Sequence, residues 1–336
     1  MNILAAYSRR FERKRRLIRA GRRAFDLKRR RIRTSDISKG NLLLFATLRN
    51  EAPRIPYFLE YYRERGVAHF LIVDNGSDDG SAELLEAAPD VSLWTTEASY
   101  KRANFGVHWI NALMHKYAHG HWCLVVDPDE FLVYPHCDSR DIPMLCDHLD
   151  EGGRVSFGTL LLDLYGEGPI PETVCEQGED PVAAAPWFDA ANYFIRRNDR
   201  YRNLWIQGGP RLRTFFEERP MHAPALNKIP LVKWRRGACF VSSTHALLPR
   251  AYNQTYDEGG GERLTGVLLH TKFLSVLSDK VEEEISRGEH FAGGREYRAY
   301  SRKIERGLTL HSPFSVKYED WRQLTALGLM ARGGWL

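Results

Sequence analysis

The sequence is poor in cysteine and has no long hydrophobic run. Its five cysteines are an odd number and include no Cys-x-x-Cys pair, so they suggest neither a disulfide framework nor a zinc ribbon. No apolar run approaches the roughly 18 residues of a membrane-spanning helix. The amino terminus lacks the order of a secretory signal, because its apolar residues (MNILAAY) precede its charges. These absences predict a cytoplasmic protein that neither spans a membrane nor is exported.

Charge is distributed unevenly along the 336 residues. The formal net charge is +5, but residues 1–34 hold 14 Lys and Arg against Glu12 and Asp26, a local balance of +12, so the rest of the chain sums to −7. The length and a hydrophobic content of 43% fit one large domain with appendages. We expect three segments: a basic arm and linker (1–40), a catalytic domain (41–275, with halves 41–135 and 136–275) and a C-terminal helical extension (276–336).

The basic arm has the spacing of a helix. Between residues 7 and 33, apolar side chains such as Phe11, Ile18 and Phe25 recur among arginines, which predicts one basic helix or two short ones around Gly21. Three roles are open: a membrane-surface helix attracted to anionic lipid, a nucleic-acid arm, or a tail that is disordered or contacts another subunit. The lipid role is the one we favour, because the body offers no nucleic-acid motif. It would place the protein peripherally at the inner face of the cell membrane.

From residue 41 onward, strand and helix patterns alternate. Apolar runs of buried-strand length alternate with helical spacing, and this repetition predicts an α/β fold with a mainly parallel sheet between helices. Ligands of such sheets bind beyond the carboxyl ends of the strands, where Thr47, Asp74 and Asp127 fall. The expected strands are 41–47, 69–74, 91–96 and 121–127, and the expected helices are 55–66, 81–88 and 105–120.

The second half is less regular. A strand is expected at 154–166, followed by a mobile loop at 167–190 that is rich in Pro, Gly and acidic residues. Further strands are expected at 212–216, 230–234, 238–243 and 266–274, then a charged helix at 275–288 and a helical end.

The segment LVVDPDEFLVYP, residues 124–135, is the strongest chemical signal. An apolar strand delivers Asp127 to its carboxyl end, and extended geometry would turn Asp127 and Asp129 to the same side, with Pro128 stiffening the turn. Two carboxylates so placed can hold Mg²⁺ or Mn²⁺ against a diphosphate. The alternative is a turn at a strand end that the Asp residues merely cap.

A second motif lies upstream of that turn. Residues 47–81 join a strand end, Thr47-Leu-Arg-Asn50-Glu51, through a helix and a strand to the loop Asp74-Asn75-Gly-Ser-Asp-Asp-Gly-Ser. This order, with the Asp-x-Asp about fifty residues later, resembles the family 2 glycosyltransferases of GT-A fold, in the bacterial type with a DPDEF metal motif. The structural alternative is a tight Asn75-Gly76 turn with Asp78 capping the next helix.

The resemblance covers residues 41–135 and implies roles for the matching positions. Thr47, Asn50 and Glu51 would line the base and ribose pocket, and Asp74 and Asn75 would contact the base or ribose. Asp127 and Asp129 would take the diphosphate-bound Mn²⁺ or Mg²⁺. Many members of that family have two adjacent acidic residues where this chain has Asp74-Asn75. The resemblance therefore does not indicate which nucleotide base the donor carries.

Outside that region the candidates are single residues. Arg102 follows the third strand and Arg211 follows a Gly turn, and either could meet a donor phosphate or be an ordinary solvated arginine. The segment 266–274 resembles one in related bacterial transferases where a histidine completes the metal shell, which would make His270 a metal ligand, with His245 as its rival. Inverting transfer needs a base, for which Asp163 and Glu217 are the leading candidates, followed by Asp189 and Glu130.

The sequence therefore predicts a metal-dependent, inverting glycosyltransferase. Its partners would be a nucleoside-diphosphate sugar donor and a saccharide or lipid-linked acceptor, and nucleic acid is not an expected partner. A nucleotidyltransferase would share the metal carboxylates, but it usually has a Gly-rich loop after the first strand, which TLRNEAPR lacks. The remaining alternative is a catalytically silent protein that binds nucleotide sugars or nucleic acid.

Overall fold

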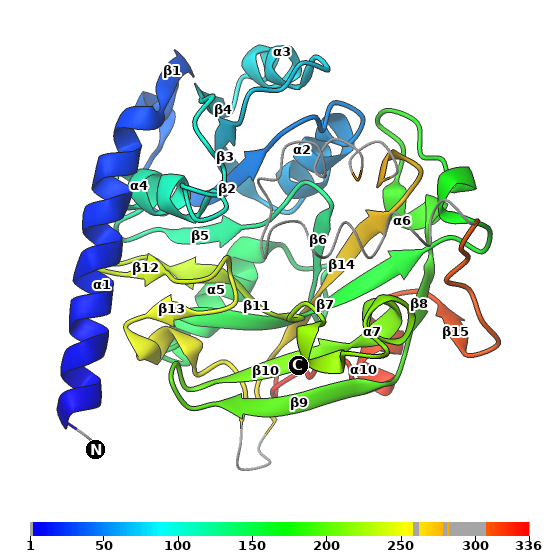
Figure 1. Ribbon diagram of the computed structural model, residues 1–336. Coiled ribbons are helices and arrows are strands. Elements are labelled where there is room, and N and C mark those ends of the chain that lie inside the picture. Colours follow the sequence, from blue (N-terminus) through cyan, green and yellow to red (C-terminus); the bar gives the residue numbers. More distant parts are fainter. Residues whose placement is uncertain (1–2, 258–261, 278–280, 282–306, 336) are drawn as a thin grey trace.

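A computed structural model describes residues 3–257, 262–277, 281 and 307–335 (Figure 1). In this part of the chain a central sheet has the order β1-β4-β3-β2-β5-β11-β7-β14-β6, with β8 pairing β7 and β15 pairing β8. Its strands are β1 Lys28–Arg31, β2 Leu42–Leu48, β3 Val67–Asp74, β4 Val91–Thr95, β5 Trp122–Val125, β6 Glu130–Val133, β7 Ser156–Tyr165, β8 Trp187–Asp189, β11 Asn227–Lys233, β14 Gly266–Phe273 and β15 Ser315–Lys317. Two small sheets add β9 Tyr193–Asn198 with β10 Asn203–Gly208, and β12 Cys239–Phe240 with β13 Leu247–Leu248.

The first half of the sheet is parallel. Strands β4, β3, β2 and β5 run in one direction, whereas β11 is antiparallel to both β5 and β7. The carboxyl ends of the four parallel strands therefore share one edge, as expected for an α/β sheet. Asp74 ends β3 at this edge, and Asp127 lies in the turn just after β5.

Helices cover both faces of the parallel strands. They are α2 Ile55–Glu64, α3 Ser81–Ala87, α4 Val107–Tyr117 and α5 Ile142–Glu151. Because side chains alternate along a strand, Leu44 of β2 joins the cluster that contains Phe58 of α2, while Phe45 joins the cluster with Trp109 of α4 on the other face. This arrangement confirms the predicted α/β class, a mixed sheet flanked by helices.

Three elements differ from the sequence prediction. Residues 212–215 of the predicted strand 212–216 belong to helix α7 Gly209–Phe215. Pro210 lies in the first turn of this helix, a position that suits proline. Residues 28–31 of the arm form strand β1, antiparallel to β4, and are not helical. The loop 167–190 contains the short helix α6 Pro181–Ala184 and strand β8. Strand β6, helix α5 and the β9–β10 hairpin were not predicted.

Helix α1, Ile3–Arg23, lies along one side of the molecule beside α4 and β12 (Figure 1). Ala20 is buried against the body, and the Arg16 guanidinium donates to the Val241 carbonyl at 2.8 Å. Glu12 accepts from Arg200 and from the Tyr201 hydroxyl, each at 3.0 Å. The described part of the arm is thus docked on the body through its inner face.

The carboxyl-terminal part contributes to the core. Helix α10, Trp321–Ala326, buries Trp321 and Leu324 in the main hydrophobic cluster. The helix expected at 275–288 lies largely outside the described residues, and the division into three segments stays a prediction. Within the described residues, no helix combines the length and the apolarity that crossing a bilayer requires.

Candidate active site at the carboxyl edge of the sheet

The turn between β5 and β6 presents three carboxylates. Asp127 is the most exposed, with 56% of its side chain accessible, while Asp129 is 19% accessible and Glu130, the first residue of β6, is buried. The backbone N–H of Thr271 donates to the Asp129 carbonyl at 2.9 Å, which ties this turn to β14. The predicted Asp-x-Asp therefore sits on a braced turn beyond the strand ends.

His270 reaches the turn from β14. This strand pairs with β6 on one side, where His270 opposes Glu130, and with β7 on the other, where it opposes Asp163. The His270 Nε2 atom lies 3.3 Å from Asp129 Oδ2, and its Nδ1 lies 2.6 Å from Asp163 Oδ1. One imidazole thus bridges a carboxylate of the turn and a buried carboxylate of the sheet.

The bridge continues to Arg211 of α7, whose Nε donates to Asp163 Oδ2 at 2.7 Å. Burial alone would raise the pKa of Asp163, but Arg211 and His270 outweigh it and lower that pKa. Burial would likewise lower the pKa of His270, yet Asp129 and Asp163 raise it to about 9. The two carboxylates thus favour the protonated form of His270, and a metal ion bound at Nε2 would have to displace that proton.

Lys228 of β11 supplies a second buried cation. Its Nζ donates to Glu130 Oε1 at 2.7 Å and lies 3.9 Å from Asp127 Oδ2. Partial desolvation and the Glu130 charge raise the pKa of Asp127, while Lys228 opposes that shift. Sequence reasoning missed Lys228, which lies just before the predicted strand 230–234 and has no local feature that would indicate its pairing with Glu130.

The carboxylate and imidazole groups at this edge of the sheet are suitable ligands for a divalent metal ion, and two of them, from Asp129 and His270, are already adjacent. Among the described residues, no three His, Cys, Asp or Glu side chains are already grouped as a metal centre. Asp129 and His270 are adjacent, and Asp163 holds the second ring nitrogen of His270, as carboxylates commonly do for metal-ligating histidines. A cation here would take two or three protein ligands and need the rest from a substrate or water.

The first predicted strand end also reaches this region. Glu51 is buried and pairs with Arg54 at 2.9 Å, and Arg54 donates to the Thr271 carbonyl at 3.3 Å, beside His270. Thr47 lies against Gly106 of the turn before α4, and its buried Oγ1 has no hydrogen-bond partner in the described part of the chain. Glu51 is thus linked to the Asp129 turn through Arg54 and Thr271.

The loop after β3 is held by its own polar side chains. The Asp74 carboxylate accepts from the Ser77 N–H at 3.2 Å, and the Asn75 amide donates to the Thr96 and Ala98 carbonyls. Asn50, at φ +52°, accepts from the Asp78 N–H at 3.0 Å. These bonds give Asp74, Asn75 and Asn50 a structural role at the sheet edge, and their predicted contacts with a donor stay predictions.

Other candidates lie outside the bonded cluster. Arg102 is exposed after β4, and Glu217 is exposed beyond the end of α7. Asp189 pairs with Arg213 at 2.6 Å, and His245 bonds to the Asn227 carbonyl. The structure therefore brings together six of the predicted residues, namely Asp127, Asp129, Glu130, Asp163, Arg211 and His270.

Comparison with known proteins found distant structural likenesses. No protein-family model matches the chain, and no curated protein matches it in sequence. A mannosyltransferase from Pyrobaculum calidifontis, solved with GDP-Man and Mn²⁺, is 17% identical with a TM-score of 0.29, over 47% of this chain and 46% of that one. A 4-diphosphocytidyl-2C-methyl-D-erythritol synthase is 16% identical with a TM-score of 0.25, over 39% and 62% of the two chains. A Bacillus anthracis protein described as a glucose-1-phosphate thymidylyltransferase, in complex with a sucrose, is 10% identical with a TM-score of 0.29, over 87% and 95%.

This chain thus spans less than two thirds of the mannosyltransferase and of the synthase. At these TM-scores the likenesses do not decide the activity, which has to be argued from the site itself.

Proposed function

We propose that the protein is a glycosyltransferase of GT-A type that uses a nucleoside-diphosphate sugar and Mn²⁺ or Mg²⁺. The observation that carries this proposal is the hydrogen-bonded series Asp129–His270–Asp163–Arg211 beside Asp127, at the carboxyl edge of the parallel strands. The acceptor would be a saccharide or a lipid-linked saccharide. The reaction would be inverting and would take place in the cytoplasm.

In this proposal Asp129 and His270 would hold the cation, and Asp127 on the same turn would be a further carboxylate ligand. A bound cation would neutralise charge that builds on the departing diphosphate. Asp163 acts as a positioning residue, because its carboxylate fixes the His270 ring with Nε2 directed to the turn. Lys228 offsets the repulsion between Asp127 and Glu130, which would otherwise oppose ionisation of the ligands.

The donor would lie between this turn and the first two strand ends. Thr47, Asn50, Glu51, Asp74 and Asn75 are proposed for the base and ribose side, and Arg102 for a phosphate. Arg211 was expected to bind the donor, but its Nε is committed to Asp163. We therefore assign Arg211 to hold Asp163, which in turn orients His270.

An inverting reaction would also need a carboxylate that accepts the proton of the acceptor hydroxyl. Both oxygens of Asp163 are engaged, Oδ1 by His270 and Oδ2 by Arg211, and its pKa is lowered, so it is poorly suited to accept a proton from an acceptor hydroxyl. An exposed carboxylate is better suited to accept this proton. Of the two leading candidates for the base, Asp163 and Glu217, we therefore propose Glu217. The variant Glu217→Gln should then lower kcat and leave donor binding unchanged.

A donor screen with two readouts tests the reaction class. Sugar transfer or donor hydrolysis releases a nucleoside diphosphate, whereas nucleotidyl transfer from a nucleoside triphosphate releases pyrophosphate. We expect Mn²⁺-dependent release of nucleoside diphosphate that is abolished by Asp129→Ala. Pyrophosphate release from a triphosphate and a sugar phosphate would establish the nucleotidyltransferase instead, and binding without either product would establish a silent nucleotide-sugar binder.

We also propose that helix α1 holds the protein against an anionic membrane surface. Its outward face bears a stripe of exposed apolar side chains, spaced by four and then seven residues and continued by Phe25 just after the helix. The exposed fractions are 71% for Tyr7, 61% for Phe11, 47% for Ile18 and 91% for Phe25. Lys14, Arg15 and Arg22 stand between them on the same face. An apolar stripe flanked by arginines is the pattern of a helix that lies in a lipid interface.

Point variants test the membrane proposal better than a deletion, because residues 28–31 form a strand of the sheet. Flotation with vesicles containing phosphatidylglycerol should recover the wild type, and Phe11→Ser/Ile18→Ser/Phe25→Ser should reduce recovery at least tenfold, since each buried side chain contributes about 1.5–3 kcal/mol. The control Phe194→Ser/Ile195→Ser removes exposed apolar side chains from β9 and should float normally. Equal flotation of the triple variant and the wild type would refute the proposal.

A further inference from the structure

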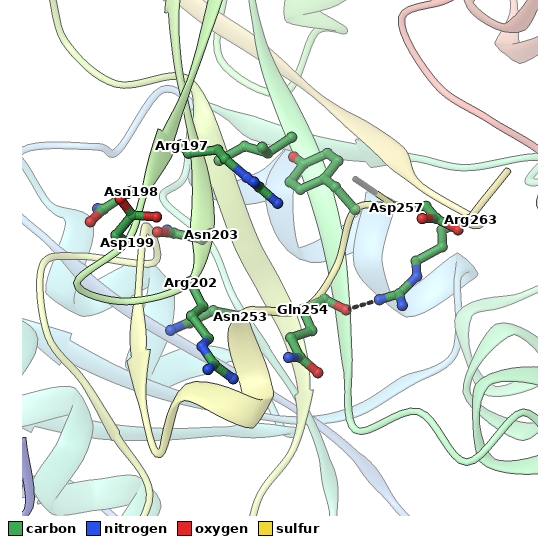
Figure 2. A pocket seen from close by; sticks show the side chains of 11 residues that line it. Arg197, Asn198, Asp199, Arg202, Asn203, Asn253, Gln254, Asp257 and Arg263 are labelled. Atoms are coloured by element: carbon green, nitrogen blue, oxygen red, sulfur yellow. Dashed lines mark hydrogen bonds between the residues drawn. The ribbon is translucent and has the colours of Figure 1, made fainter. Parts of the chain in front are cut away.

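A cavity of about 440 Å³ lies at the turn end of the β9–β10 hairpin, apart from the Asp129 cluster (Figure 2). Side chains of the hairpin form one part of its wall, and the segment that follows β13 forms the other. None of the residues that bond around Asp129 and His270 lines it. Its volume is within the range of small-molecule sites, about 300–1,000 Å³.

Asn203 contributes a fixed and buried amide to this wall. The residue is 4% exposed, and its Nδ2 donates to the His245 carbonyl at 2.7 Å, which fixes the orientation of the amide. In the described part of the chain, its buried Oδ1 has no hydrogen-bond partner. Because this oxygen has almost no accessible surface, a ligand in the cavity does not reach it. The amide contacts of a ligand would come from Asn198 and Gln254, which also line the wall.

Three arginines surround the same cavity. In Figure 2, Arg197 and Arg202 lie on the hairpin side and Arg263 lies on the opposite side, where it donates to the Gln254 carbonyl at 2.5 Å. Burial and the neighbouring charges of Arg9 and Arg202 lower the pKa of Arg250 nearby, so the surroundings are electropositive. Although Asp199 and Asp257 also line the wall, the arginines outnumber them, which favours a ligand with an acidic group.

The wall also contains an anchored aromatic ring. Tyr256 donates its hydroxyl to the Thr159 carbonyl at 2.9 Å, and Leu204 lines the cavity with it. Amide and guanidinium groups together with a fixed aromatic ring can bind the hydroxyl groups and the apolar face of a sugar ring. The composition of the wall is therefore suited to a polyhydroxylated ligand.

We propose that this cavity binds an acidic saccharide, in which hydroxyl groups bond to the Asn198 and Gln254 amides and a carboxylate or phosphate meets Arg202 and Arg263. The inference rests on the proposed function in one respect only, namely that the saccharide would be a segment of the acceptor away from its reacting end. A binding site remote from the chemistry would let the protein hold a growing chain by units that are not being modified.

Calorimetric titration with an oligogalacturonate of four residues tests this inference on the full chain. The wild type should bind it, maltotetraose should bind at least tenfold more weakly, and Arg202→Gln/Arg263→Gln should lose at least tenfold. Arg236→Gln, an exposed arginine outside the cavity, is the matched control and should bind normally. Asp129→Ala should also bind normally, which separates this site from the proposed catalytic one.

Three results with the wild type would overturn the inference. They are no binding of the acidic oligosaccharide, equal affinity for the acidic and neutral oligosaccharides, and inorganic phosphate binding as tightly as the oligosaccharide. Unchanged binding by Arg202→Gln/Arg263→Gln would move any observed site elsewhere on the molecule and so refute the assignment too.

Discussion

At the scale of single residues, the site depends on charges that satisfy one another. Asp163 and Arg211 are both almost fully buried, and each is the charge partner of the other at 2.7 Å. The sequence identified both as candidates, but it did not indicate that they pair, because they come from β7 and α7, elements far apart in the chain. Removal of one partner leaves the other charge buried.

This pairing predicts a strong coupling in stability. Asp163→Asn alone should lower the free energy of unfolding by about 3–5 kcal/mol, since Arg211 and His270 lose their carboxylate. The double variant Asp163→Asn/Arg211→Gln should lose at least about 1 kcal/mol less than the sum of the single losses. Urea unfolding measures both, with the exposed Asp199→Asn as a control. Simple additivity would contradict the pairing.

Gly106 provides a second residue-scale prediction. Its φ is +75°, and a Cβ there would lie 3.0 Å from the Thr47 Cβ and Oγ1 atoms at the sheet edge. Gly106→Ala should therefore lower the free energy of unfolding by about 1–3 kcal/mol. Gly21→Ala is the matched control, because Gly21 is helical with nothing within 4 Å, and it should be neutral or stabilising by up to about 1 kcal/mol. Equal effects in thermal unfolding would argue against the strained contact.

At the scale of elements, α1 and α4 meet across a buried histidine. Burial, followed by the charges of Arg16, Arg19 and Arg23 on α1, lowers the pKa of His108 to about 4. The unfolded chain takes up this proton near pH 6.5, whereas the folded protein resists it down to about pH 4. The stability from the neutral histidine is thus complete above about pH 6.5 and is lost as the pH falls towards 4.

Acid should therefore weaken the fold through His108. Between about pH 6.5 and 4 this group should lower the free energy of unfolding by about 1.4 kcal/mol per pH unit. His108→Asn should reduce that slope, while His115→Gln, an exposed histidine of the same helix, should not change it. Chemical denaturation at a series of pH values checks this, and an unchanged slope in His108→Asn would show that the histidine does not control the acid response.

Strand β1 makes the arm part of the sheet. Lys28 to Arg31 pair with β4 and cover its edge, so removal of residues 1–34 exposes an unpaired strand whereas removal of residues 1–23 does not. We expect the longer deletion to aggregate and the shorter one to remain monodisperse in light scattering. Aggregation of both to the same degree would mean that loss of α1, and not of the strand, is responsible.

At the scale of the whole molecule, the sequence predicted the first half much better than the second. Strands such as β2 are buried on both faces, so their apolar runs and the helices between them are evident locally. Residues 212–215 of the LRTFF segment are helical in the structure. Leu212 and Phe216 are four residues apart, a spacing that also fits a helix, and in so short a segment the apolar pattern does not distinguish a helix from a strand. The Asp129–His270 contact depends on β14 pairing between β6 and β7, a long-range register that no local pattern encodes.

The central claim is that Asp129 and His270 form a metal-dependent site for a nucleoside diphosphate, and calorimetric titration with GDP and UDP tests it most directly. With Mn²⁺, the wild type should bind one of them at least about tenfold more tightly than in EDTA, and Asp129→Ala/His270→Ala should lose this difference. The control Asp199→Ala should retain it. Affinity that is the same with and without Mn²⁺, or the same in wild type and double variant, would contradict the claim.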